Sequence, residues 1–98
     1  MAQCILTAMD PKRLSKLHSL LMSRQEEVFR ISFFDGETYD LSQFYAFEDG
    51  ACIATVIDFV NISEEKRNLF EQGSAMEFNL NDALEVRDRR TDEIIFSL

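Results

Sequence analysis

The chain has 98 residues, of which 46% are hydrophobic and nine are phenylalanine. This composition allows one domain with its own core, over residues 1–98, and excludes an intrinsically disordered protein. The formal net charge is −8; a folded domain with such a field repels phosphate backbones and attracts basic surfaces, so we expect no direct nucleic-acid binding.

The first predicted element is an amphipathic helix over residues 10–24. Asp10 suits the cap of this helix and Pro11 its first turn. Leucines recur at a spacing of three and four residues, at positions 14, 17, 20 and 21. The basic side chains lie off that stripe: Lys12, Arg13 and Lys16. The helix is the one basic element of the chain.

After the helix the hydrophobic period changes to two, which predicts β-strands. Residues 27–34 form the first expected strand, and Asp35-Gly36 is a strong hairpin signal. Residues 37–45 are the expected return strand. The consecutive aromatic residues Phe44 and Tyr45 indicate a bulge or a sharp bend near its end.

The second half of the chain predicts one central strand, a polar loop and three shorter strands. Residues 51–60 are almost continuously apolar, as expected for a strand covered on both faces. Residues 61–74 are polar and predict a loop, with room for one helical turn begun at Ser63. Further strands are expected over residues 76–80, 84–88 and 93–98, with a tight turn at 81–83 and the last strand at an edge.

This order predicts an α+β fold that is mainly β. We expect the N-terminal helix to be followed, over residues 27–98, by a small bent antiparallel barrel of five or six strands, of the SH3-like or Sm-like kind. Such a barrel would bury many phenylalanines in a short chain. An α+β roll with a flat sheet is the alternative.

The start of the chain carries no signal for export or membrane insertion. No basic residue precedes its first short apolar run, and no stretch approaches the roughly 18–20 apolar residues of a membrane helix. Cys4 and Cys52 lie in apolar surroundings without CxxC spacing, which indicates free thiols in a reducing compartment. We therefore expect a cytoplasmic protein.

Catalytic and cofactor motifs are not visible in the sequence. His18 is the only histidine, and there is no Gly-rich phosphate loop or HExxH pattern. The carboxylates at positions 35, 37 and 40 lack the glycine and closing glutamate of a calcium loop. We predict a non-enzymatic protein without a cofactor or a dedicated metal site.

The most informative stretch lies between Arg30 and Lys66, which contains no lysine or arginine. It carries eight carboxylates: Asp35, Glu37, Asp40, Glu48, Asp49, Asp58, Glu64 and Glu65. Carboxylates on a rigid sheet can take the place of phosphates against arginine and lysine. Acids at turns also serve ordinary solvation and protect sheet edges from aggregation, and the sequence leaves both readings open.

Two segments carry a resemblance to a known fold. VFRISFFDGETYDL, at 28–41, resembles the first hairpin of Sm-like folds, and MEFNLNDALEVRD, at 76–88, is similar to their strand–turn–strand. Within that fold the chain resembles the bacterial Rho-binding antiterminator family, small acidic proteins that bind the terminator Rho and block its RNA-binding surface. The resemblance implies a partner-binding surface made by the acids Asp35, Glu37, Asp40, Glu48 and Asp49.

We therefore expect an acidic protein-interaction module that regulates transcription by binding a basic RNA-binding partner, with inhibition of Rho-dependent termination as its effect. Lys12, Arg13 and Lys16 would fix its orientation on the partner. The alternatives are an immunity or antitoxin-like inhibitor of a toxin nuclease, and a small ligand-binding barrel. An RNA-binding protein would instead expose stacking aromatics, and we expect the candidates in the core or at the bend: Phe34, Tyr39, Phe44 and Tyr45.

Overall fold

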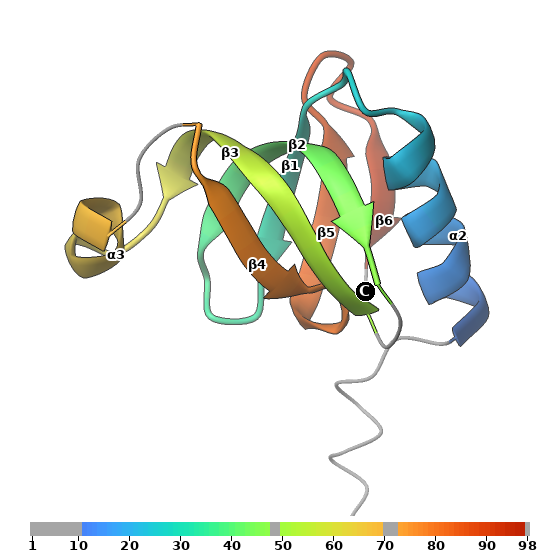
Figure 1. Cartoon of the computed structure of the whole chain (residues 1–98), viewed down its shortest axis with the longest axis horizontal. Helices are drawn as coiled ribbons and strands as arrows, with labels where there is room; N and C mark the ends of the chain where they lie inside the picture. The colour runs from blue at the N-terminus through green and yellow to red at the C-terminus, as the bar shows by residue number, and fades with distance from the viewer. Residues whose placement is uncertain (1–10, 48–49, 70–72, 98) are drawn as a thin grey trace, which may run out of the picture.

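The computed structural model describes residues 11–47, 50–69 and 73–97. One long helix lies beside a six-stranded antiparallel sheet (Figure 1). The elements in chain order are α2 (Pro11–Ser23), β1 (Phe29–Phe33), β2 (Thr38–Ala46), β3 (Ala51–Asn61), α3 (Glu64–Leu69), β4 (Ala75–Asn79), the 3₁₀ helix η2 (Leu80–Asp82), β5 (Ala83–Asp88) and β6 (Ile94–Ser97). This order confirms the predicted α+β, mainly β class.

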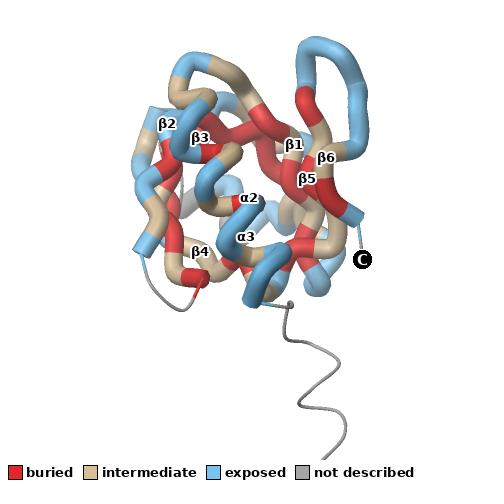
Figure 2. The backbone as a smooth tube through the Cα atoms, turned by 90° about the vertical axis from the view of Figure 1, so that its right-hand side faces the viewer, coloured by how far each residue is buried: buried red, intermediate tan, exposed pale blue. Residues whose placement is uncertain are grey.

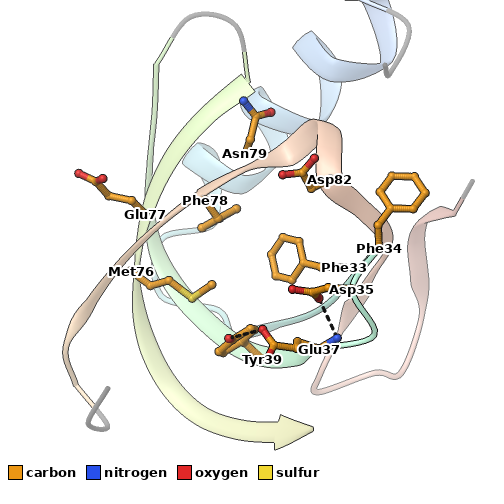
Figure 3. A pocket seen from close by; sticks show the side chains of 10 residues that line it. All are labelled: Phe33, Phe34, Asp35, Glu37, Tyr39, Met76, Glu77, Phe78, Asn79 and Asp82. Carbon is orange, nitrogen blue, oxygen red and sulfur yellow. Dashed lines mark hydrogen bonds between the residues drawn. The ribbon is translucent and has the colours of Figure 1, made fainter. Parts of the chain in front are cut away.

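The strands are arranged in the order β4-β3-β2-β1-β5-β6, and every neighbouring pair is antiparallel. Gln43 adopts a φ of 56° in β2, and the register with β3 shifts between Ser42 and Tyr45. Such bulges increase strand twist and bending, and β3 curves strongly around the interior (Figure 3). In the described part of the chain, β4 and β6 each pair on one side only, so the sheet is not closed.

The core fills the inside of the bent sheet. Phe29, Ile31, Leu41, Val56 and Val86 are fully buried. Figure 2 shows buried stretches along the strands and exposed residues at the turns. Six rings form a continuous chain of edge-to-face contacts, with centroids 5.5 to 6.3 Å apart, in the order Phe29, Phe44, Phe78, Phe33, Tyr39, Phe59. Aromatic contacts of this kind stabilise beyond the area they bury.

The helix α2 packs onto the sheet with its leucine stripe, as its spacing predicts. Leu17 and Leu21 are buried in the core, and Leu14 and Leu20 are partly buried against it. Its observed bounds agree with the predicted ones to within one residue. None of the helices in the described residues is long and apolar enough to span a membrane.

The prediction that β3 is covered on both faces is wrong. Cys52, Ala54 and Val56 point into the core, but Ile57 on the other side is 36% exposed. Ala51, Ile53 and Thr55 on the outer face are only partly buried, so the core face alone is fully buried. The apolar run therefore provides one core face and one solvent-facing apolar strip.

The bend in β2 separates its two neighbouring aromatic residues. Phe44 is buried, whereas Tyr45 is 60% exposed and lies with its ring centroid 5.0 Å from that of Phe47.

The polar segment 61–74 contains the short helix α3, and the carbonyl of Ser63 accepts a hydrogen bond from the amide of Arg67. The helical turn expected at Ser63 is thus confirmed.

Candidate functional site

An acidic pocket opens between the β1–β2 turn and strand β4 (Figure 3). Its volume is about 330 Å³. The lining residues come from β1, the β1–β2 turn, β2, β4 and η2, and they are carboxylates, large apolar or aromatic side chains and one amide: Phe33, Phe34, Asp35, Glu37, Tyr39, Met76, Glu77, Phe78, Asn79 and Asp82. No basic side chain of the described residues lines it. We call this cavity the acidic pocket.

The β1–β2 turn provides two of the acids. Gly36 adopts a φ of +87°, a conformation that side chains disfavour, and this explains glycine after Asp35. The Asp35 Oδ1 accepts a hydrogen bond from the amide of Glu37 at 2.9 Å. The amide of Phe33 donates to the carbonyl of Glu37 at 2.9 Å, which closes the hairpin. The turn predicted from Asp35-Gly36 therefore forms and points its carboxylates to the pocket.

The 3₁₀ helix η2 provides the acid on the opposite wall. The amide of Phe34 donates to the carbonyl of Asp82 at 2.9 Å, and this bond joins the β1–β2 turn to η2. Asn79 caps η2, since its Oδ1 accepts from the amide of Asn81 at 2.9 Å. These bonds bring Asp35 and Asp82 to the walls of one cavity, although they lie far apart in the sequence.

The floor of the acidic pocket is aromatic. Phe33 and Tyr39 are buried, and the ring of Phe78 packs edge-to-face on Phe33 at 5.5 Å. The Tyr39 hydroxyl donates to Glu37 Oε1 at 3.0 Å. Burial, and then this bond to Glu37, raise the pKa of Tyr39, so the phenol stays neutral at physiological pH. Phe34, 45% exposed, lies at the rim.

This combination suits a cation. Arginine and lysine form charge-assisted hydrogen bonds with carboxylates, and they are attracted to aromatic faces. The same carboxylates repel a phosphate or another anion. In the described residues no group of three or more His, Cys, Asp or Glu side chains is placed to hold a metal ion. The charge and the aromatic lining of the pocket are chemically compatible with basic side chains.

Asp35 and Glu37 lie where the prediction places them, but Asp40 does not. Its side chain is 0% exposed, so the prediction that it faces a partner is wrong. It alternates with the core residues Tyr39 and Leu41, and it therefore points to the other side of the sheet. There Arg30 and Arg89 contact its carboxylate at 2.9 and 3.3 Å. Glu48 and Asp49 lie outside the described residues.

The predicted basic residues lie away from the acidic pocket, because α2 and the β1–β2 turn occupy opposite sides of the molecule (Figure 1). Arg13 makes internal contacts: its Nη2 donates to the carbonyl of Ser97 at 3.0 Å, and its guanidinium lies 4.8 Å from the centroid of the Phe96 ring. It holds α2 to β6. Lys12 and Lys16 are exposed on the same helix.

Sequence reasoning did not find Glu77, Asp82 or Phe78 as site residues. The sequence predicts the element of each residue but not its place at a pocket. Asp82 falls in the predicted turn at 81–83, and Glu77 alternates with core residues in the predicted fourth strand. Asp82 and Phe78 line the same cavity as Asp35 because the sheet bends and the amide of Phe34 bonds to the carbonyl of Asp82. The Glu77 carboxylate points to the other side of β4 (Figure 3). Of the four candidate stacking aromatics, Phe34 and Tyr45 are exposed, and Tyr39 and Phe44 are buried.

Comparison of the chain with protein-family models, with curated proteins and with solved structures found no match.

Proposed function

We propose that this chain is a non-enzymatic, acidic interaction module that binds the basic surface of a nucleic-acid-binding protein, with Rho factor as the first candidate partner. The observation that carries the proposal is the acidic pocket, a cavity that Asp35, Glu37 and Asp82 line together with aromatic side chains. A ligand that occupies a basic RNA-binding surface competes with RNA for it. The expected effect is inhibition of Rho-dependent termination in the cytoplasm.

The architecture supports the same reading. The helix before β1, the bent antiparallel sheet and the 3₁₀ turn between β4 and β5 are compatible with a partly open SH3-like or Sm-like barrel. We propose this fold type for the chain, in agreement with the resemblance of its first hairpin and of residues 76–88.

The charge distribution also supports a basic protein partner over direct nucleic-acid binding. Five arginines from the α2–β1 connection, β1, β5 and the following turn form ion pairs within the chain: Arg24, Arg30, Arg87, Arg89 and Arg90. Carboxylates of the same chain balance the positive charge of these arginines, and this weakens the attraction of the arginines for phosphates. The surplus of negative charge is left to the rest of the surface, including the acidic pocket.

Competition with RNA tests the proposal. A labelled cytidine-rich RNA oligonucleotide is bound to purified Rho, this protein is added at two salt concentrations, and fluorescence anisotropy is followed. We expect the anisotropy to fall, more strongly at low salt, because association between opposite charges is screened by ions. No displacement at low salt removes Rho as the partner. If the anisotropy of the RNA rises when this protein is added without Rho, the prediction that the chain does not bind nucleic acid directly is contradicted.

A matched pair of charge variants locates the binding surface. Asp35→Asn combined with Asp82→Asn removes two pocket charges, and the amide introduced in the turn retains an oxygen that can accept the turn hydrogen bond. Glu26→Gln combined with Glu93→Gln removes two exposed charges outside the pocket. We expect about a tenfold weaker displacement from the pocket variant and less than about a twofold change from the control. If both double variants lose displacement equally, binding depends on the overall negative charge of the protein and not on the pocket.

A further inference from the structure

We infer that the acidic pocket receives an extended basic segment of the partner, which adds as a strand to the open edge of β4. This inference rests on the proposed function and specifies how the basic ligand is held. Strand addition supplies main-chain hydrogen bonds, and pockets beside the strand then select the side chains.

The edge of β4 is available for pairing. β4 pairs with β3, with Ala54 opposite Met76 and Cys52 opposite Phe78, and no described strand pairs with its other side. The amide of Val56 donates to the carbonyl of Ser74. Because hydrogen-bonded positions alternate in an antiparallel pair, Met76 and Phe78 bond to β3, and the backbone groups of Ala75 and Glu77 point away from it.

The acidic pocket borders this same edge. Four consecutive positions of β4 line it, from Met76 to Asn79. Figure 3 shows the side chains of Met76 and Phe78 on the pocket side of the strand and the Glu77 carboxylate on the other side. A strand laid along β4 would therefore place alternate side chains into the pocket and the remaining ones beside Glu77.

The charges decide which strand fits. On the pocket side an added strand meets Asp35, Glu37 and Asp82, and on the other side it meets Glu77. If β4 paired with β4 of a second copy, two chains that each carry a net charge of −8 would meet, and their Glu77 carboxylates would lie close together. Like charges across a strand pair are destabilising. A segment with arginine or lysine at alternate positions is complementary on the pocket side. β4 has five residues, so the pairing segment is similarly short.

N-methylated peptides test the geometry. The probe is a labelled nine-residue peptide in which arginine alternates with threonine, added to the full chain at low salt and followed by fluorescence anisotropy. One derivative carries N-methyl groups on its threonine amides and the other on its arginine amides, so their charge and length are equal. Only one set of amides can face β4 when the arginines enter the pocket. We expect that set alone, when methylated, to weaken binding by about tenfold or more.

The affected set also reports strand direction. With arginine in the pocket, an antiparallel peptide directs its threonine amides to β4, and a parallel peptide directs its arginine amides there. Equal binding of both derivatives, or equal loss, overturns strand addition while a basic ligand still binds. Failure of the unmodified peptide to bind at low salt contradicts the proposed function itself.

Variants of β4 provide a second readout. Glu77→Pro removes the outward backbone N–H, and Glu77→Gln removes only the charge. We expect the proline variant to bind the unmodified peptide several-fold more weakly than the glutamine variant, with thermal unfolding used to check that both fold. Equal affinities in two folded variants would contradict pairing at this edge. A dimer in sedimentation that dissociates when Glu77→Pro is introduced would assign the edge to a second copy instead.

Discussion

Arg30 and Asp40 lie opposite each other on β1 and β2, and the Arg30 Nε is 2.9 Å from Asp40 Oδ1. The Arg30 Nη2 lies 3.2 Å from the second oxygen, which Arg89 Nε also approaches at 3.3 Å. The hydrogen bond to Asp40 raises the pKa of Arg30, so the guanidinium stays charged. One of the acids in the lysine- and arginine-free stretch is therefore a structural group, not a surface charge.

Removing this carboxylate should destabilise the fold. For Asp40→Asn we expect the free energy of unfolding to fall by about 2 kcal/mol, because two partly exposed arginines lose the buried, charged acceptor that they share. Asp35→Asn, on the exposed turn, should change it by less than about 0.5 kcal/mol. Urea denaturation followed by circular dichroism measures both. Equal effects would show that the Asp40 network does not stabilise the sheet.

Arg13 should stabilise the docking of α2. For Arg13→Ala we expect a loss of about 1 kcal/mol in the free energy of unfolding, since the contact with the Phe96 ring and the hydrogen bond to the Ser97 carbonyl both disappear. Lys16→Ala removes the same charge from the same helix and serves as the control. Thermal unfolding compares the two variants. If Lys16→Ala lowers the free energy of unfolding by the same amount, Arg13 stabilises the protein only through the charge of the helix.

Two glycines separate the effect of backbone conformation from that of steric contact. A Cβ at Gly50 would lie 2.5 Å from Asn79 Oδ1 and 2.7 Å from Asn81 Nδ2, whereas a Cβ at Gly73 would meet no atom within 4 Å. Both residues have positive φ, so each alanine variant should cost about 1 kcal/mol from the backbone.

Gly50→Ala should therefore destabilise the protein more than Gly73→Ala, by at least about 1 kcal/mol, because the cap of η2 must also shift. Parallel urea titrations of the two variants measure the difference. An identical loss would mean that the asparagine side chains move aside freely.

His18 should make stability fall with acidification. Its partial burial lowers the pKa of the imidazole below the ordinary value of 6.5. As the pH falls through 6.5 the unfolded chain takes up the proton first, so the free energy of unfolding decreases down to the folded-state pKa. His18→Gln should flatten the decline between about pH 7.5 and 5.5, measured by denaturation at several pH values. An unchanged slope would assign the decline to other groups.

Local patterns determined much of the fold. The leucine spacing of 11–23 and the Asp35-Gly36 turn act over a few residues, so the helix and the first hairpin could be predicted without knowing what surrounds them. The predicted strand positions also agree with the observed ones to within two residues at each end. The coverage of β3 could not be predicted this way, because an apolar run does not state whether a second layer exists to cover its outer face.

The sequence by itself determined that the chain is acidic, is mainly β and has carboxylates at its first hairpin. The tertiary structure alone decided which acids line the same cavity. Asp40 lies in an arginine network because of the alternation of β2 and the pairing of β1 with β5, whereas Asp82 lines the same cavity as Asp35 because the bent sheet brings η2 to the turn. The reason is physical: charge is a property of each residue, but exposure and proximity depend on strand order and register.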